Sequence, residues 1–356
     1  MFFKGPEIFG IYSLVTIQVG FFTYLSLHGL PNVIQFKISN KEKINSFFFI
    51  PSLLILLVVS LLTSSNETID SKTFYAILLG SIFSAFINIY TIGIKKYLNN
   101  CLFVFFFNIW ILAVIIFDQF FDLNISNIFL FWGANSLIMI CISIIYISYQ
   151  KFLKEIFFCY DLEGLRNVIS NIFIGLPYEL FRYLERNYFS FALSEVLFGV
   201  YSFLIYIVSS FQGVFIRSKN QILINKIKKE TSDYLIRLHQ NEIFKVYAWM
   251  IVPYIIFLIL SINFYELAKL NHLLILLLPF VYNLFYNNAT SYLVYLSLFD
   301  EYKSKLKLCL LLSITQAVMF IIATIIDNLN ITFLMVILYF LSFNFVTRNQ
   351  YRKTAF

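Results

Sequence analysis

The feature of this sequence that most constrains its fold is a series of apolar runs along the whole chain. Each run is about 17 to 25 residues long, the length at which an α-helix crosses the hydrocarbon core of a bilayer. Charged residues make up only 13% of the 356 residues, whereas hydrophobic residues make up 60%. A typical soluble domain carries about 25% charged residues. The sequence therefore predicts an all-α polytopic membrane protein.

About eleven apolar spans mark the transmembrane helices that we expect. The segments between them are short, and none could fold as a separate soluble domain. The longest polar segment, residues 217–245, is basic and predicted to be helical. The predicted spans are 8–36, 47–63, 73–93, 101–117, 125–149, 167–190, 195–217, 244–262, 270–297, 306–326 and 329–347.

Lysine and arginine residues fall almost entirely in alternate connecting segments. One set of segments holds 21 of the 26 basic residues, whereas the other set holds only Lys4, Lys72 and Lys269. Basic residues concentrate in the cytoplasmic loops of membrane proteins, so the first set is predicted to be cytoplasmic. The amino terminus then lies outside and the carboxyl terminus lies in the cytoplasm. This loop pattern accounts for the net charge of +7, and we expect no nucleic-acid partner.

A short motif occurs twice, as FGIYS in residues 9–13 and as FGVYS in residues 198–202. Each copy lies at the start of an apolar span that leads into a basic segment. Tandem halves of this kind are typical of transporters with two lobes around a central path. We therefore expect an N-terminal lobe of about five helices in residues 1–150 and a C-terminal lobe of about six in residues 151–356.

The strongest candidate for a binding site is a group of four charged residues in the apolar span 167–190. At 100° per residue, Glu179, Arg182, Glu185 and Arg186 fall within an arc of about 120° on one helix face. The spacing predicts the pairs Glu179–Arg182 and Arg182–Glu185, and it leaves the two arginines side by side. Charges inside a membrane helix are costly unless they face protein or water.

Two interpretations of these four charges stay open. One is a self-neutralised network that holds helices together. The other is an anion-recognising wall of a water-filled cavity, because the planar fork of arginine binds two phosphate oxygens at once.

A second candidate is the pair of adjacent amides Asn287 and Asn288 in the span 270–297. Such amides usually bond to a neighbouring helix, although they could also line a substrate path. The four cysteines and three histidines lack the spacing of a metal site. We expect no catalytic residue, metal or cofactor, and we expect most of the 44 phenylalanines and 24 tyrosines to face lipid or the membrane interface.

A family resemblance rests on the run GPEIFGIYS, residues 5–13, and on the later HGLPNVIQF, residues 28–36. Together they resemble the outside turn and second helix of bacterial O-antigen flippases, the polysaccharide branch of the multidrug/oligosaccharidyl-lipid/polysaccharide exporter superfamily. Residues 167–202 are similar to the seventh helix of that family, with a charged pair like Glu185-Arg186, and to its second FG-x-Y-S turn. Helix order and loop charges agree over essentially the whole chain. Family members have about twelve helices, so we expect the first helix of the N-terminal lobe to be missing here.

The resemblance implies a flippase for lipopolysaccharide biosynthesis in the bacterial cytoplasmic membrane. Such a protein moves undecaprenyl-diphosphate-linked oligosaccharide units from the cytoplasmic to the outer leaflet. Arg182 and Arg186 would hold the diphosphate or acidic sugars, and Glu179 or Glu185 could titrate in coupling to a proton or sodium ion. The implied partners are the lipid-linked oligosaccharide, membrane lipid and the polysaccharide polymerase machinery.

Two other functions stay open. An O-antigen polymerase is also polytopic and rich in aromatic residues, but such enzymes carry a large outside loop with arginines, and every predicted outside segment here is short. An inactive or accessory membrane fragment would follow from an N-terminal lobe that lacks one helix.

Overall fold

A computed structural model describes residues 5–26, 70–93, 97–121, 123–149, 162–227, 232–265 and 270–355. These residues form helices joined by short turns, and no strand occurs among them. Within the described ranges, six helices are long and apolar enough to cross a membrane. The chain is therefore an all-α, multi-pass membrane protein, as the apolar runs predict.

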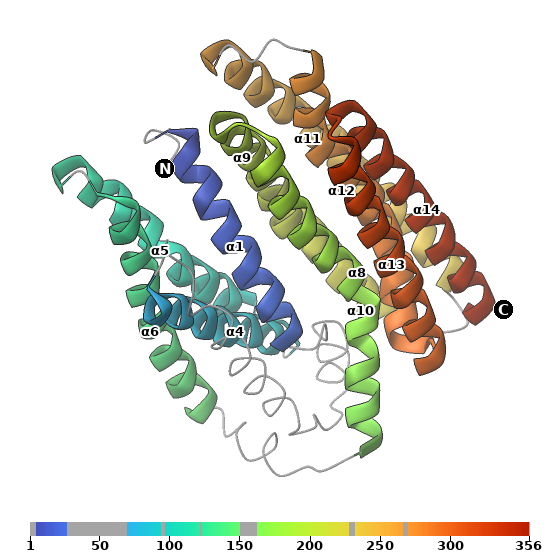
Figure 1. The fold of residues 1–356 in the computed structure, drawn as a ribbon. Helices are drawn as coiled ribbons and strands as arrows, with labels where there is room; N and C mark the ends of the chain where they lie inside the picture. Colours follow the sequence, from blue (N-terminus) through green and yellow to red (C-terminus); the bar gives the residue numbers. More distant parts are fainter. Residues whose placement is uncertain are drawn as a thin grey trace. The chain divides into compact units, whose positions relative to one another are not determined.

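The helices follow one another along the chain as Figure 1 shows. Those before residue 150 are α1 (Pro6–Ser26), α4 (Ser71–Gly93), α5 (Tyr97–Phe121) and α6 (Ile125–Tyr149). Those after it are α8 (Leu162–Ala192), α9 (Glu195–Phe211), the π-helix η3 (Gln212–Ile216), α10 (Arg217–Lys226), α11 (Ser232–Tyr265), α12 (Leu270–Phe299), α13 (Tyr302–Ile326) and α14 (Leu329–Ala355).

Most of the predicted spans coincide with these helices to within a few residues. The span 47–63 and the second part of 8–36 lie outside the described residues. The basic segment 217–245 is helical where the structure describes it, because it contains α10 and the first turns of α11. The helix α8 carries the four charges of the predicted stripe, and it is not among the six helices that are long and apolar enough to cross a membrane. The number of transmembrane helices therefore stays a prediction.

The chain divides into two compact units. One comprises Met1–Ile17 and Phe173–Phe356, and the other comprises Gln18–Ile172. The predicted lobe boundary at residues 150 and 151 lies outside the described residues and stays a prediction. The first turns of α1 thus belong to the same unit as α9, and both copies of the repeated motif lie in this unit.

In the unit Gln18–Ile172, α4 packs against α5 and α6, which also pack against each other. Small residues allow α4 and α6 to approach closely. A Cβ atom on Gly80 would overlap the side chain of Ser136, and one on Gly133 would lie 3.2 Å from Cγ2 of Thr73. Contacts between small residues are typical of helix pairs in membranes.

In the larger unit, α12 packs against α9, α10, α11 and α14, and Figure 1 shows α12 and α14 side by side. Aromatic side chains fill the interior. The expectation that most aromatic residues face lipid or the membrane interface stays a prediction. The ten largest fully buried side chains of the described part are all tyrosines and phenylalanines, and all but Phe129 lie in this unit: Tyr201, Tyr247, Tyr254, Tyr282, Tyr295, Phe129, Phe181, Phe189, Phe340 and Phe343.

These buried tyrosines are tolerated where the hydroxyl finds an acceptor. The Tyr254 hydroxyl, for example, donates to the backbone carbonyl of Leu276. A lipid-facing tyrosine at the same depth would have no such acceptor. Tyrosine can therefore fill the interior of this unit as phenylalanine does.

Candidate functional site

The two copies of the repeated motif meet where α1 and α9 begin. A Cβ atom on Gly199 would overlap the backbone carbonyl of Pro6, and one on Gly10 would lie 2.9 Å from Cδ1 of Phe198. Glycine at both positions lets the two helices cross in direct contact. The start of α9 is fixed by Ser194, whose side chain accepts a hydrogen bond from the backbone N–H of Leu197, as a helix N-cap does.

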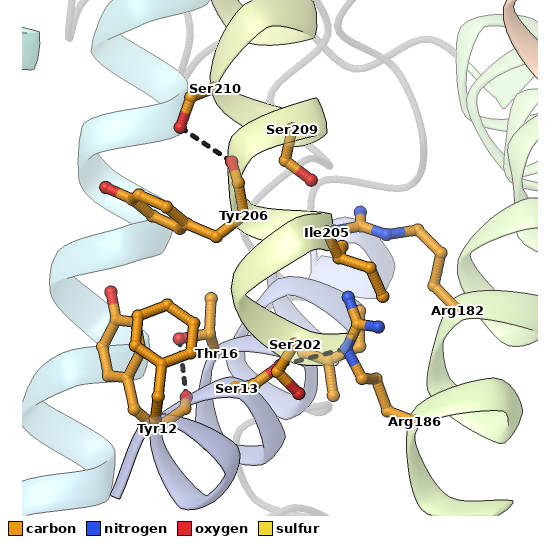
Figure 2. Close-up of a pocket in the computed structure, with 12 residues that line it drawn as sticks. Tyr12, Ser13, Thr16, Arg182, Arg186, Ser202, Ile205, Tyr206, Ser209 and Ser210 are labelled. Carbon is orange, nitrogen blue, oxygen red and sulfur yellow. Dashed lines mark hydrogen bonds between the residues drawn. The ribbon is translucent and has the colours of Figure 1, made fainter. Parts of the chain in front are cut away.

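Beside this crossing, α1, α8 and α9 line a cavity of about 240 Å³ (Figure 2). Two of its walls come from α1 and α9, with lining residues at the same helical spacing of i, i+3, i+4, i+7 and i+8. The α8 wall contributes Arg182 and Arg186. The lining residues of the other two walls are Phe9, Tyr12, Ser13, Thr16 and Ile17 on α1, and Ser202, Ile205, Tyr206, Ser209 and Ser210 on α9.

One pair of corresponding residues of the repeated motif lines this cavity from the two helices. Ser13 and Ser202 are the last residues of the two motif copies, and both line the cavity. Figure 2 shows them near the Arg186 guanidinium. The serines were not predicted as site residues, although the repeated FG-x-Y-S motif was the signal that could have singled them out.

The four charged residues of the predicted stripe on α8 form two ion pairs. Arg182 Nη1 lies 3.1 Å from Glu179 Oε2, and Arg186 Nη1 lies 3.2 Å from Glu185 Oε2. The predicted pairing of Arg182 with Glu185 is replaced by pairing between sequence neighbours, because the Tyr201 hydroxyl binds the Glu185 carboxylate from α9 and Ser13 binds Arg186 from α1. The Arg186 Nε atom donates to Ser13 Oγ over 3.0 Å.

The two pairs differ in burial. Glu185 is 0% exposed and Arg186 3% exposed, whereas Glu179 and Arg182 are half-buried. The ion pairs fit the interpretation of a self-neutralised network, whereas anion recognition stays a prediction. Each arginine is neutralised by a glutamate, and both arginines also line the cavity.

Ser202 carries a buried polar atom that no described residue satisfies. The residue is 1% exposed, and its Oγ has no hydrogen-bond partner among the residues that the structure describes. Leaving a buried hydroxyl unpaired costs about 1–3 kcal/mol. The Nη2 atoms of Arg182 and Arg186 also make no hydrogen bond to a described residue. The cavity therefore offers hydrogen-bond donors to an oxygen-rich group such as a phosphate, a carboxylate or a sugar hydroxyl.

Asn287 and Asn288 do not line this cavity. Asn287 is buried and donates to the Tyr247 hydroxyl of α11 over 2.8 Å. Asn288 is exposed and donates to Asn344 Oδ1 of α14 over 3.4 Å. Successive residues of a helix point about 100° apart, so the two amides connect α12 to different neighbours.

A buried polar network in the same unit was not predicted. Asn283 Oδ1 accepts hydrogen bonds from the Tyr178 hydroxyl and from Gln212 Nε2, both over 2.8 Å. Gln212 also donates to Tyr247 over 2.8 Å, and it is the first residue of the π-helix η3. The sequence shows these amides as polar residues within apolar spans, but its spacing cannot indicate contacts between separate helices.

No protein-family model matches the chain, and no curated protein or solved structure has a significant match to it. The fold and the site define a multi-pass helical membrane protein with two arginines on the wall of a small cavity.

Proposed function

We propose that this protein is a flippase that moves undecaprenyl-diphosphate-linked oligosaccharides from the cytoplasmic to the outer leaflet of the bacterial cytoplasmic membrane. The observation that carries the proposal is the position of Arg182 and Arg186, which extend from α8 into one cavity (Figure 2). Arginine binds phosphate with a planar fork of N–H groups. The Ser202 hydroxyl is a further donor for phosphate or sugar oxygens.

The two arginines play different parts in this proposal. Arg186 is held by Glu185 and Ser13, and its Cζ lies 5.7 Å from the ring centroid of Tyr201. It forms the fixed wall of the site. Arg182 pairs with Glu179, and its Cζ lies 5.7 Å from the ring centroid of Tyr178. The Arg182 side chain is 27% exposed, against 4% for Arg186, so Arg182 can exchange its carboxylate for a ligand oxygen at lower cost.

In this proposal, the charged residues of the site favour the release of an anionic substrate as well as its binding. Two glutamates neutralise the two arginines, so an anionic substrate must displace a carboxylate from at least one arginine. Transport requires binding that is favourable enough for entry and weak enough for exit. A proton or sodium ion that neutralises Glu179 or Glu185 would shift this competition toward the substrate, which is how ion coupling would act here.

The volume of the cavity limits what it can hold in this conformation. Pockets for drug-sized ligands have volumes of about 300–1,000 Å³, and this cavity has about 240 Å³. It can take a diphosphate or a single sugar of the substrate. A complete oligosaccharide would require α1 and α9 to separate beyond their glycine crossing.

The test is complementation of a strain that lacks the gene. The Arg182→Gln/Arg186→Gln variant should insert in the membrane and lower transport about tenfold or more, because a hydrogen bond to a charged group contributes about 1.5–3 kcal/mol. The measured quantities are surface polysaccharide and the leaflet in which lipid-linked units accumulate. The matched control is Arg348→Gln/Arg352→Gln, which removes two exposed arginines of α14. Arg182→Gln alone serves if the double variant is absent from the membrane.

Each outcome separates the candidate functions. Units trapped in the cytoplasmic leaflet support the flippase. Units that reach the outer leaflet without being polymerised assign the protein to polymerisation instead. Normal polysaccharide in the deletion strain contradicts both functions, and normal polysaccharide from the variants that lack the arginines contradicts their role.

A further inference from the structure

A larger hollow of about 610 Å³ lies between the C-terminal parts of α8 and α13. It shares no lining residue with the arginine-lined cavity, so it is independent of the proposed function. Both helices line it at helical spacing. The lining residues are Leu184, Asn187, Tyr188, Phe191 and Ala192 on α8, Ala317, Phe320, Ile321 and Thr324 on α13, and Asp327 in the turn after α13.

The rim of this groove is apolar and exposed. Phe191 is 88% exposed and Ile321 is 60% exposed. The helix α13 is one of the six that can cross a membrane, so large apolar side chains on its surface face lipid. The inner wall is closed by Phe320, which is buried, and by Tyr188, whose hydroxyl lies 3.1 Å from Thr332 Oγ1 of α14. The groove therefore opens toward hydrocarbon and fits a lipid chain.

One end of the groove is polar. The Tyr188 hydroxyl donates to the carbonyl of Ala323 over 3.4 Å, which sets this part of α8 level with the last turn of α13. Asp327 follows in a left-handed conformation, with φ of 48°, and it is one of the residues that line the groove. Neither that carboxylate nor Asn187 Oδ1 accepts a hydrogen bond from the residues that the structure describes.

These two acceptors select the headgroup of the lipid. Asp327 is exposed and lines the same groove as Asn187, and a carboxylate and an amide oxygen both attract an ammonium group, which has three N–H donors and a positive charge. The same carboxylate repels an anionic headgroup that has no cation. The bound lipid must therefore combine an apolar chain with a cationic headgroup atom.

We propose that the groove binds one acyl chain of a phosphatidylethanolamine molecule and that Asp327 and Asn187 bind its ammonium group. The chain lies between Phe191 and Ile321 against Phe320. The loop charges predict that this end of α13 faces outward, so the lipid belongs to the outer leaflet.

The test compares lipids retained by the purified full-length protein. The protein is equilibrated in detergent with equal amounts of phosphatidylethanolamine and phosphatidylglycerol of the same chain length, and bound lipid is counted by native mass spectrometry. We expect wild type to prefer phosphatidylethanolamine by about two- to fivefold, the size of an exposed ion pair. Asp327→Asn should remove this preference, and asparagine tolerates the left-handed conformation at this turn.

Two further variants test whether the lipid binds in this groove. Glu195→Gln changes an exposed acidic residue in the first turn of α9; it lies outside the groove lining and should keep the preference. Ala317→Trp should fill the groove and lower retention of both lipids. Equal retention of the two lipids by wild type, a preference for phosphatidylglycerol, or a preference that survives Asp327→Asn would overturn the proposal.

Discussion

At the scale of residues, the two serines of the repeated motif occupy corresponding positions but have different partners. Ser13 Oγ accepts a hydrogen bond from the buried Arg186, whereas Ser202 Oγ has no partner among the described residues. Removing the Ser13 hydroxyl would leave the charged donor of Arg186 without its acceptor. Removing the Ser202 hydroxyl would leave no described group unpaired. Variants of these two serines can therefore distinguish an effect on stability from an effect on ligand binding.

We predict that Ser13→Ala lowers the free energy of unfolding by about 1–3 kcal/mol, while Ser202→Ala leaves it unchanged or raises it slightly. Ser202→Ala should instead lower transport, because the ligand loses a donor. Thermal unfolding in detergent gives the first comparison, and surface polysaccharide in the complemented strain gives the second. Equal destabilisation by the two variants would show that Ser202 has a structural partner. Full transport by Ser202→Ala would remove this residue from the site.

Sequence spacing predicted part of this site. At 3.6 residues per turn, the four charges had to share one face of α8, and the structure brings both arginines to one cavity. Spacing could not predict that Tyr201 and Ser13 would redirect Glu185 and Arg186 toward each other, since these partners come from α9 and α1. For the same reason it could not distinguish Asn287, which bonds to α11, from Asn288, which bonds to α14.

At the scale of elements, the contact between α1 and α9 depends on glycine. Apolar runs predicted both helices, and the repeated motif predicted that they were related. Neither pattern predicted that the two copies would cross, because a repeat in the sequence does not determine which surfaces meet. The physical reason for the crossing is the missing side chain at Gly10 and Gly199, which brings the backbones into contact, as small residues do in membrane helix pairs.

We predict that Gly199→Ala destabilises the protein by at least about 1–3 kcal/mol, the usual cost of overpacking. The added Cβ atom would overlap the backbone carbonyl of Pro6, and a backbone atom cannot move aside as a flexible side chain can. Gly20→Ala in α1 is the matched control, because its Cβ atom would meet nothing within 4 Å, and alanine stabilises a helix relative to glycine by about 1 kcal/mol. Thermal unfolding compares the two variants. If Gly199→Ala were as stable as Gly20→Ala, α1 would not cross α9 at this residue.

At the scale of the whole molecule, α8 shows how a charged helix fits a membrane protein. Its charges exclude it from the helices that are apolar enough to span by composition alone. They are nevertheless paired with each other and with Tyr201 and Ser13, which lowers the cost of burying them. We therefore expect α8 to cross the membrane despite its charges.

The orientation of the chain depends on whether the number of membrane crossings between two turns is odd or even. Between the turn at Ser194 and the turn at Glu301 lie α9 continuing through η3 and α10, then α11, then α12. If each of these three segments crosses the membrane once, the two turns lie on opposite sides. The basic residues Lys303, Lys305 and Lys307 follow the second turn, so the positive-inside rule places that turn in the cytoplasm.

We expect Ser194→Cys, in a variant without the four native cysteines, to react with a membrane-impermeant maleimide in intact cells. Glu301→Cys should react only after permeabilisation. Both positions are exposed, so a difference in labelling reports sidedness and not burial. The opposite pattern would reverse the orientation while keeping an odd number of crossings. Labelling of both cysteines from outside would require an even number of crossings, and one of the three segments would then lie along the membrane surface.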